Sequence, residues 1–224
     1  MSKKILVIAA HPDDEVMGCG GTIACLTKER DEVYCLFLGE GVTSRYSNME
    51  QAEKEKEQLK AQAGQAAKIL GIRKVFFRDF PDNRFDTVPL LTIVKTIEEI
   101  KEQVKPNIVY THHHGDLNID HQITFRAVLT ACRPVKGETV KEIYSFEVPS
   151  STEWSYRNYF MPNVFVDISA TLDKKVEALN AYHSEIREYP HPRSPEVLRA
   201  IALRWGSIIG CEAAEAFELI RAIR

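Results

Sequence analysis

Three side chains that bind metals or transfer protons occur close together near the start of the chain. His11, Asp13 and Asp14 follow a short apolar run in the segment AHPDDE. Imidazole and carboxylate groups suit Zn²⁺, and a catalytic zinc site needs three protein ligands and one open position for water. Since His11 and Asp14 lie either side of a proline turn, both can face one ion. Asp13 is then free to take a proton from a bound water.

The same segment has two other interpretations. Pro12 and the acidic side chains after it are typical of a helix start, where the helix dipole favours negative charge. Gly18, Gly20 and Gly21 also allow a phosphate-binding loop of a nucleotide-dependent enzyme. That loop requires glycines directly after the strand, where this chain has carboxylates that repel a pyrophosphate. A metal site therefore needs a third ligand from elsewhere in the chain.

A second segment rich in His and Asp, THHHGDLNIDH, spans residues 111–121. Successive residues of an extended chain point in opposite directions. His112, His113 and His114 therefore cannot all face one ion, and we expect at most one or two of them to be functional. His121 lies at the start of a predicted helix and is the candidate third ligand. Its alternative role is that of a mere neighbour of a helix cap.

The two segments resemble the motifs of the LmbE-like/PIG-L family of zinc-dependent N-acetylglucosaminyl deacetylases. AHPDDE matches the first family motif in full, and NIDH is close to the second. The order of strands and helices resembles the family over most of the chain. The resemblance implies that His11, Asp14 and His121 bind Zn²⁺, and that Asp13 is the general base for the water that attacks the acetyl carbon.

The second motif departs from the family pattern at its first position. The family often has His-x-Asp-His, whose first histidine acts as an acid or stabilises an oxyanion, whereas this chain has Asn118. An amide can donate a hydrogen bond to an oxyanion but supplies no proton. Asp13 can return its proton to the leaving amine, and we expect Asp120 to orient a histidine as a hydrogen-bond acceptor. The histidines that are candidates for the missing acid are His113, His114 and His191.

Residues in later loops are candidates to bind the substrate. Arg84 follows a predicted strand and suits a hydroxyl, phosphate or carboxylate, although a solvated surface arginine is the alternative. Trp154 is a candidate to stack on a sugar, although a tryptophan more often packs in a core. His191 and Arg193 lie in the segment EYPHPRSPE. We expect this segment to form a lid in which Arg193 faces an anionic group of the substrate.

The elements that position these residues alternate along the chain. We predict strands at 4–10, 32–38, 74–77, 107–111, 143–148 and 164–168, and helices at 15–29, 49–70, 88–104, 121–132, 173–186 and 195–209. This order predicts an α/β, Rossmann-like fold with a mainly parallel sheet and helices on both faces. The first and fourth strands are then neighbours. Their carboxyl ends bring the two segments together where such sheets bind ligands.

Composition limits the class of protein. The 224 residues carry a net charge of −3, which predicts no general attraction to nucleic acid or anionic membrane. No apolar run approaches the ~18–20 residues of a membrane span, and the run at 5–10 is too short for a secretory signal. The five cysteines are scattered and contain no CxxC pair, as in a reduced cytoplasmic protein. We predict a single domain over residues 1–224.

Together these features predict a zinc-dependent hydrolase that removes an acetyl group from an N-acetylated amino sugar or its conjugate. Two alternatives stay open: a zinc amidase for a non-sugar acylated amine, and a catalytically weakened metal- or carbohydrate-binding protein. Iron or manganese also suits two histidines and a carboxylate, and a homo-oligomer is compatible with the sequence.

Overall fold

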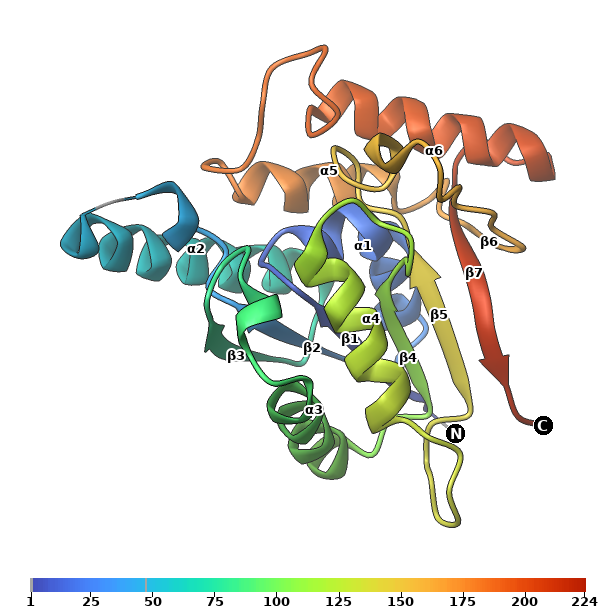
Figure 1. The fold of residues 1–224 in the computed structure, drawn as a ribbon. Coiled ribbons are helices and arrows are strands. Elements are labelled where there is room, and N and C mark those ends of the chain that lie inside the picture. The colour runs from blue at the N-terminus through green and yellow to red at the C-terminus, as the bar shows by residue number, and fades with distance from the viewer. Residues whose placement is uncertain (1, 47) are drawn as a thin grey trace.

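Apolar segments that are buried on both faces form the centre of one seven-stranded sheet (Figure 1). The strand order is β3-β2-β1-β4-β5-β7-β6. The parallel strands are β1 (Lys4–Ala9), β2 (Glu32–Gly39), β3 (Lys74–Phe80), β4 (Ile108–His112) and β5 (Glu142–Phe146). β7 (Ala214–Ala222) is antiparallel to both β5 and β6 (Val164–Asp167). The computed structural model describes residues 2–46 and 48–224.

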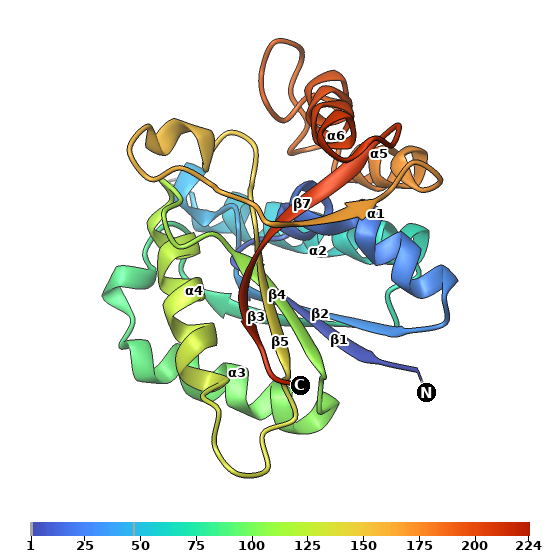
Figure 2. The ribbon, with the colours of Figure 1, turned by 90° about the vertical axis from the view of Figure 1, so that its right-hand side faces the viewer.

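Helices cover both faces of the sheet, as Figure 2 shows. One face carries α1 (Asp14–Lys28), α2 (Met49–Leu70), α5 (Leu172–Ala181) and α6 (Pro195–Ile209), and the other carries α3 (Leu90–Val104) and α4 (Ile119–Ala131). Side chains of a strand alternate between the faces. In β1, Val7 therefore packs in the core under α1 and α2, while Leu6 packs under α3 and α4.

Local sequence signals explain where several helices begin and end. The Asn48 side chain accepts a hydrogen bond from Glu50 N (2.9 Å), and Gly71 ends α2 with a φ of 78°. Ser194 caps α6, whose first residue is proline. These are the residue types that favour helix ends, because they satisfy free backbone groups or adopt a left-handed conformation.

The predicted α/β fold is confirmed, and so is the pairing of the first and fourth predicted strands, with Leu6 opposite Val109. Two predictions about the C-terminal part were wrong. The helix predicted at 173–186 ends at Ala181, where the buried Tyr182 anchors the chain by donating from its hydroxyl to Glu15 Oε1 (2.6 Å). Strand β7 was missed, because charged residues interrupt its apolar pattern AEAFELIRA.

The glycines of α1 serve close packing and do not form a phosphate-binding loop, so that interpretation was wrong. They lie buried inside the helix. A Cβ atom at Gly18 would lie 2.2 Å from Phe146 Cδ2, and one at Gly21 would lie 2.7 Å from Ile168 Cδ1. Only a glycine permits such an approach. Among the described residues, no helix has both the length and the apolar character needed to cross a membrane.

Candidate functional site

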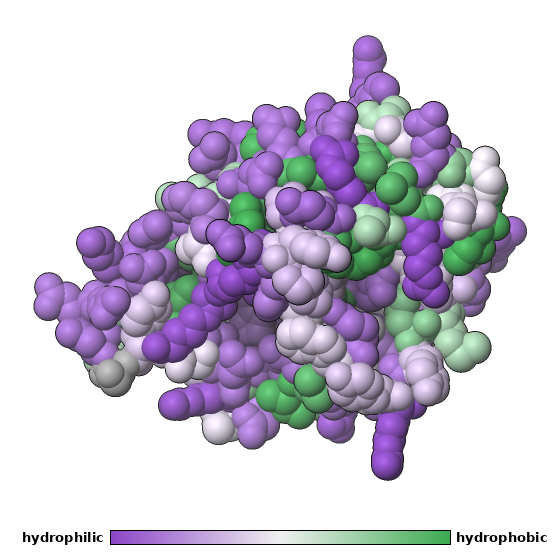
Figure 3. Space-filling model, turned by 90° about the horizontal axis from the view of Figure 1, so that it is seen from above, coloured by the Kyte–Doolittle hydropathy of each residue, from purple (hydrophilic) through white to green (hydrophobic). Residues whose placement is uncertain are grey.

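Loops at the carboxyl ends of the parallel strands meet above the centre of the sheet. Because β1 pairs directly with β4, the segment after β1 lies beside the segment between β4 and α4. Seen from above, this face is mainly hydrophilic and is hollowed near its middle (Figure 3). The position is the one where open α/β sheets bind their ligands.

The three predicted metal ligands converge at this position. Asp14 Oδ2 lies 3.6 Å from His11 Nδ1 and 3.4 Å from His121 Nε2, and all three side chains are buried. Two ligands of a tetrahedral zinc ion, each ~2.0–2.1 Å from the metal, lie about 3.3 Å apart. Asp14 Oδ1 is buried without a hydrogen-bond partner. The donor set and its spacing therefore fit a divalent ion.

A carboxylate lies on the far side of each imidazole. His11 Nε2 donates to Asp120 Oδ2 at 3.0 Å, which leaves Nδ1 facing Asp14. His121 Nδ1 lies 3.2 Å from Asp116 Oδ1. A metal-binding histidine usually has such an acceptor at its second nitrogen, which fixes the tautomer and the ring orientation. The structure thus places Asp120 at hydrogen-bonding distance from the His11 ring.

The charges around these imidazoles favour a cation. Burial by itself lowers the pKa of His11, but the Asp120 and Asp14 carboxylates outweigh it and raise the pKa to about 10. For His121, burial is likewise outweighed by Asp14 and Asp116, which raise its pKa to about 9. Carboxylates beside an imidazole stabilise its charged form. The same negative field stabilises a bound metal ion.

His112 lies in this cluster but does not offer a lone pair. Its Nε2 accepts a hydrogen bond from Ala10 N at 2.8 Å, and its ring stacks on His121 with centroids 3.9 Å apart. Burial lowers the pKa of His112 to about 3, so this ring is neutral. Its contacts indicate that it supports the His121 ring.

Asp13 lies beside the three ligands in an unusual backbone conformation. Its φ of 114° is outside the regions that a residue with a side chain ordinarily adopts. Arg193 Nη1 donates to Asp13 Oδ2 at 3.0 Å. Burial raises the pKa of the Asp13 carboxyl well above its usual range, and Arg193 opposes that shift. A strained, buried carboxylate next to a candidate metal-binding cluster is suited to accept a proton.

Asn118 combines a structural contact with a position at the site. Its Oδ1 caps α4 by accepting from Asp120 N (2.8 Å), and its Nδ2 donates to Asn83 Oδ1 (3.1 Å). Asp120 in turn accepts from Asn83 N (2.7 Å) and Phe85 N (2.9 Å). The loop after β3 is thereby fastened to the start of α4, and the Asn118 side chain is held at the wall of the cavity.

The cavity next to the ligands is small and polar. Its volume is about 40 Å³, and besides His11 and Asp13 it is lined by Arg45, Asp82, Asn83, Asn118, Glu185 and Arg193. Arg45 closes one side by pairing with Glu185 through two hydrogen bonds of 2.8 and 2.7 Å. This space is large enough for water molecules but smaller than a sugar ring.

The predicted substrate-binding residues Arg84, Trp154, His191 and Arg193 differ in their position relative to the cavity. Of these residues, the structure brings only Arg193 to the cavity wall. Arg84 lines an adjoining cavity of about 320 Å³ that also borders Asp82. The Trp154 ring contacts His191 edge-on with centroids 6.0 Å apart, and His191 Nδ1 accepts from Arg193 N (3.1 Å). His191 therefore supports the position of Arg193.

His114, the predicted assisting histidine, lies elsewhere. It is exposed and contacts His113, with ring centroids 4.4 Å apart. Neither histidine is among the residues that line the cavity.

Three carboxylates of the site were not predicted. Asp82 and Asp116 follow predicted strands at the carboxyl edge of the sheet, and this position could have identified them as site residues. Asp116 is held by the hydroxyls of Ser151 and Thr152. Nothing in the sequence pointed to Glu185, because we assigned it to the helix predicted at 173–186, and that helix ends at Ala181.

Known proteins are similar to this chain in sequence and in fold. Residues 6–132 match the PIG-L family model, described as GlcNAc-PI de-N-acetylase. The uncharacterized deacetylase YaiS of Escherichia coli (strain K12) is 30% identical over 171 residues, which cover 74% of this chain and 82% of YaiS. Diacetylchitobiose deacetylase of Thermococcus kodakarensis is 28% identical over 232 residues, covering 99% of this chain and 84% of that enzyme.

A solved structure shows the same fold. N,N'-diacetylchitobiose deacetylase from Pyrococcus horikoshii, complexed with its inhibitor MPG, aligns with a TM-score of 0.81 at 21% sequence identity. The alignment covers 98% of this chain and 84% of that one. The family match includes every residue of the two motifs, whereas Glu185 and Arg193 lie beyond it.

Proposed function

This chain belongs to the PIG-L family, whose model is described as GlcNAc-PI de-N-acetylase, and from this premise we propose that it is a metal-dependent N-deacetylase of an N-acetylated amino sugar or its conjugate. One observation carries the proposal. Two imidazoles and a carboxylate converge at ligand spacing, beside a buried carboxylate that is not one of the ligands.

The proposed metal ligands are His11, Asp14 and His121, and the proposed ion is Zn²⁺. When bound, such an ion polarises the acetamide carbonyl and makes a water more acidic. The buried, unpartnered Asp14 Oδ1 and the carboxylates behind both imidazoles support this assignment. The choice of zinc over iron or manganese rests on the family resemblance, because the donor set suits all three.

The protein's own residues supply the proton transfers. Asp13 accepts a proton from the attacking water and returns it to the leaving amine, and the products are acetate and a free amino sugar. Arg193 holds the Asp13 carboxylate through the 3.0 Å hydrogen bond. Asn118 lines the cavity, and its amide is the proposed donor to the developing oxyanion. In this arrangement Asp13 acts as both base and acid, because the Asn118 amide donates a hydrogen bond but does not transfer a proton.

The size of the cavity favours an acetyl group over a longer acyl chain. The polar space of about 40 Å³ has no apolar wall for a chain of methylenes, and such a chain gains its binding energy from apolar burial. The sugar hydroxyls suit the polar rim formed by Arg45, Asn83 and Asn118. The relatives named for diacetylchitobiose support an N-acetylglucosamine unit as the substrate.

We further propose that the chain acts as one domain in the cytoplasm. A single sheet contains both β1, near the N-terminus, and β7, near the C-terminus, which supports one domain. All five cysteines are free, which is typical of a reducing compartment.

A panel of N-acetylated sugars and non-sugar N-acylated amines tests the function. Release of free amine from the sugars, lost with a chelator and restored by Zn²⁺, is the expected result. Turnover of the non-sugar amines alone would instead identify a general amidase. Tight metal binding without turnover of any acylated amine would identify a binding protein.

A further inference from the structure

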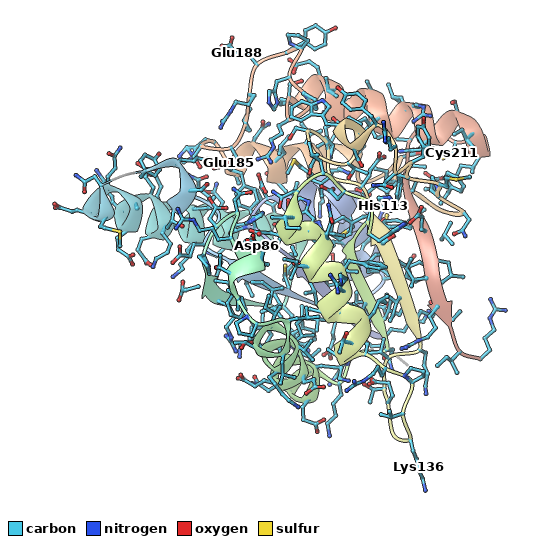
Figure 4. All side chains as sticks on the ribbon, in the orientation of Figure 1. Asp86, His113, Lys136, Glu185, Glu188 and Cys211 are labelled. Atoms are coloured by element: carbon cyan, nitrogen blue, oxygen red, sulfur yellow. The ribbon has the colours of Figure 1, made fainter. Side chains whose placement is uncertain are left out.

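Two more imidazoles and a carboxylate converge outside the catalytic cavity. His113 and His114 follow the end of β4, and Glu218 lies on β7. Their candidate ligand atoms all lie within 4.8 Å of one another, and His113 Nδ1 is 2.9 Å from Glu218 Oε2. Figure 4 shows His113 near the upper ends of β5 and β7. We call these three residues the β4–β7 cluster.

The β4–β7 cluster is separate from the proposed catalytic centre. The His112 ring stacks on His121, whereas the next residue, His113, packs edge-on against Phe160, with ring centroids 5.4 Å apart. No member of the cluster is among the residues that line the catalytic cavity. The change of side between His112 and His113 is the alternation expected of an extended chain.

The surroundings hold the cluster in place. Glu218 Oε1 accepts from Met161 N (2.8 Å), and Glu218 Oε2 accepts from Ser145 Oγ (3.2 Å) in addition to His113. The ring of His114 lies between His113 and Phe125, with centroids 4.4 and 5.7 Å away. Prior ordering of this kind reduces the entropy lost when a ligand binds.

The Glu218 carboxylate supplies the negative charge of the cluster. Burial raises the pKa of the Glu218 carboxyl, but the hydrogen bonds from His113 and Met161 outweigh burial and lower it. Among the described residues, no lysine or arginine lies within ion-pairing distance of Glu218. A partly buried carboxylate usually has such a partner.

The His113 ring contacts Glu218 through Nδ1. Its Nε2 is buried and has no hydrogen-bond partner. An ion bound by both Nδ1 and Glu218 Oε2 would replace the proton between these two atoms, because histidine binds a metal through a deprotonated nitrogen. The separation of 2.9 Å between Nδ1 and Oε2 is near that of two ligands on one ion. His114 is exposed, so its side of the cluster is open to an ion and to water ligands.

We propose that His113, His114 and Glu218 form a second metal site, which binds a transition-metal ion such as Zn²⁺. Two imidazoles and one carboxylate suit zinc, nickel or copper and not magnesium or calcium, which prefer oxygen ligands. An ion held there joins the C-terminal strand to the strand that leads into the His121 loop, and so stabilises the native sheet. The site does not depend on the proposed deacetylase function.

Zinc stoichiometry of the full chain without a polyhistidine tag tests the site. We expect two zinc ions per wild-type chain by calorimetric titration, and one each for His114→Ala, Glu218→Gln and His121→Ala. The double variant His114→Ala/His121→Ala is expected to bind none. His183→Ala removes an exposed histidine outside both sites and should keep both ions.

Thermal unfolding with and without Zn²⁺ supplies a second measurement. In His121→Ala, zinc should raise Tm through the remaining site, and the addition of His114→Ala should abolish that shift. A single ion in the wild type, lost in His121→Ala and kept in His114→Ala, would overturn the second site and leave the catalytic centre intact. Two ions in both His114→Ala and Glu218→Gln would also overturn it.

Discussion

Arg193 Nη1 donates a hydrogen bond of 3.0 Å to Asp13 Oδ2, although 180 positions separate the two residues along the chain. The sequence led us to expect Arg193 to face an anionic group of the substrate. In the structure, the anionic group that it contacts belongs to the protein. Arg193 Nε also donates to Ser150 Oγ (2.7 Å), and Arg193 Nη1 lies 3.4 Å from Glu185. A loop outside the family-matched segment therefore fixes the orientation of the proposed base.

Arg193→Lys tests this contact. A lysine keeps the charge but cannot reproduce the forked contacts of a guanidinium. Loss of a hydrogen bond to a charged group costs about 1.5–3 kcal/mol, so we expect kcat for acetate release to fall about 10- to 100-fold. Zinc content should not change. A higher KM with an unchanged kcat would show that Arg193 binds substrate and does not position Asp13.

Asp13→Asn removes the proposed base while keeping the size of the side chain. General acid–base catalysis contributes about 10²–10⁴-fold to a rate, and we expect a loss of that order in acetate release. Metal analysis of the same sample must show a zinc content equal to that of the wild type. The matched control is Asp86→Asn, at an exposed aspartate after β3, which should retain activity. Near-normal turnover by Asp13→Asn would exclude Asp13 as the base.

Asp120→Asn tests how the metal site is held. Asp120 accepts from His11 Nε2 and from two backbone N–H groups of the loop after β3. Replacing such an acceptor behind a metal-binding histidine usually lowers metal affinity about 10- to 100-fold. Competition with a chelating dye should show this loss, and excess Zn²⁺ should restore much of the activity. Unchanged affinity would mean that Asp120 only fastens the loop.

The part of the site that could be predicted from sequence is the part built on consecutive residues. His11, Asp13 and Asp14 occur together after β1, and a strand order common to α/β folds brings His121 beside them. The contacts of Asp13 with Arg193 and of Arg193 with Glu185 join residues far apart in the chain. Such contacts depend on the course of a loop, for which hydrophobic periodicity contains no information.

The same reason explains the mistaken position of His114. The sequence indicates that the three consecutive histidines cannot all face one ion, but the face that each one occupies depends on the register of β4 against β5. With His112 opposite Phe146, His112 points towards His121. The following histidines lie near β7, a strand that the sequence did not reveal.

The buried ion pair between Lys175 and Glu215 supports α1, the helix that follows the first motif. Loss of this pair should lower the free energy of unfolding. The helical dihedrals of α1 break at Cys19, with a φ of −145°. Glu215 accepts from the N–H groups of Gly21 (2.9 Å) and Thr22 (2.7 Å) beyond the break. Lys175 Nζ donates to Met17 O (2.8 Å) and lies 2.5 Å from Glu215 Oε1. The pair therefore satisfies backbone groups that the helix leaves free.

Lys175→Met leaves the Glu215 charge buried without its partner, and breaking a buried pair in this way costs about 3–5 kcal/mol. We expect that loss in the free energy of unfolding measured with urea. Glu215→Gln in the same chain should recover part of it, because the amide oxygen still accepts from Gly21 and Thr22 while the buried charge is removed. Lys174→Met, at the neighbouring exposed lysine, is the matched control and should change stability by less than about 1 kcal/mol. Equal stability of Lys175→Met and Lys174→Met would mean that the Lys175–Glu215 pair does not stabilise α1 at its break.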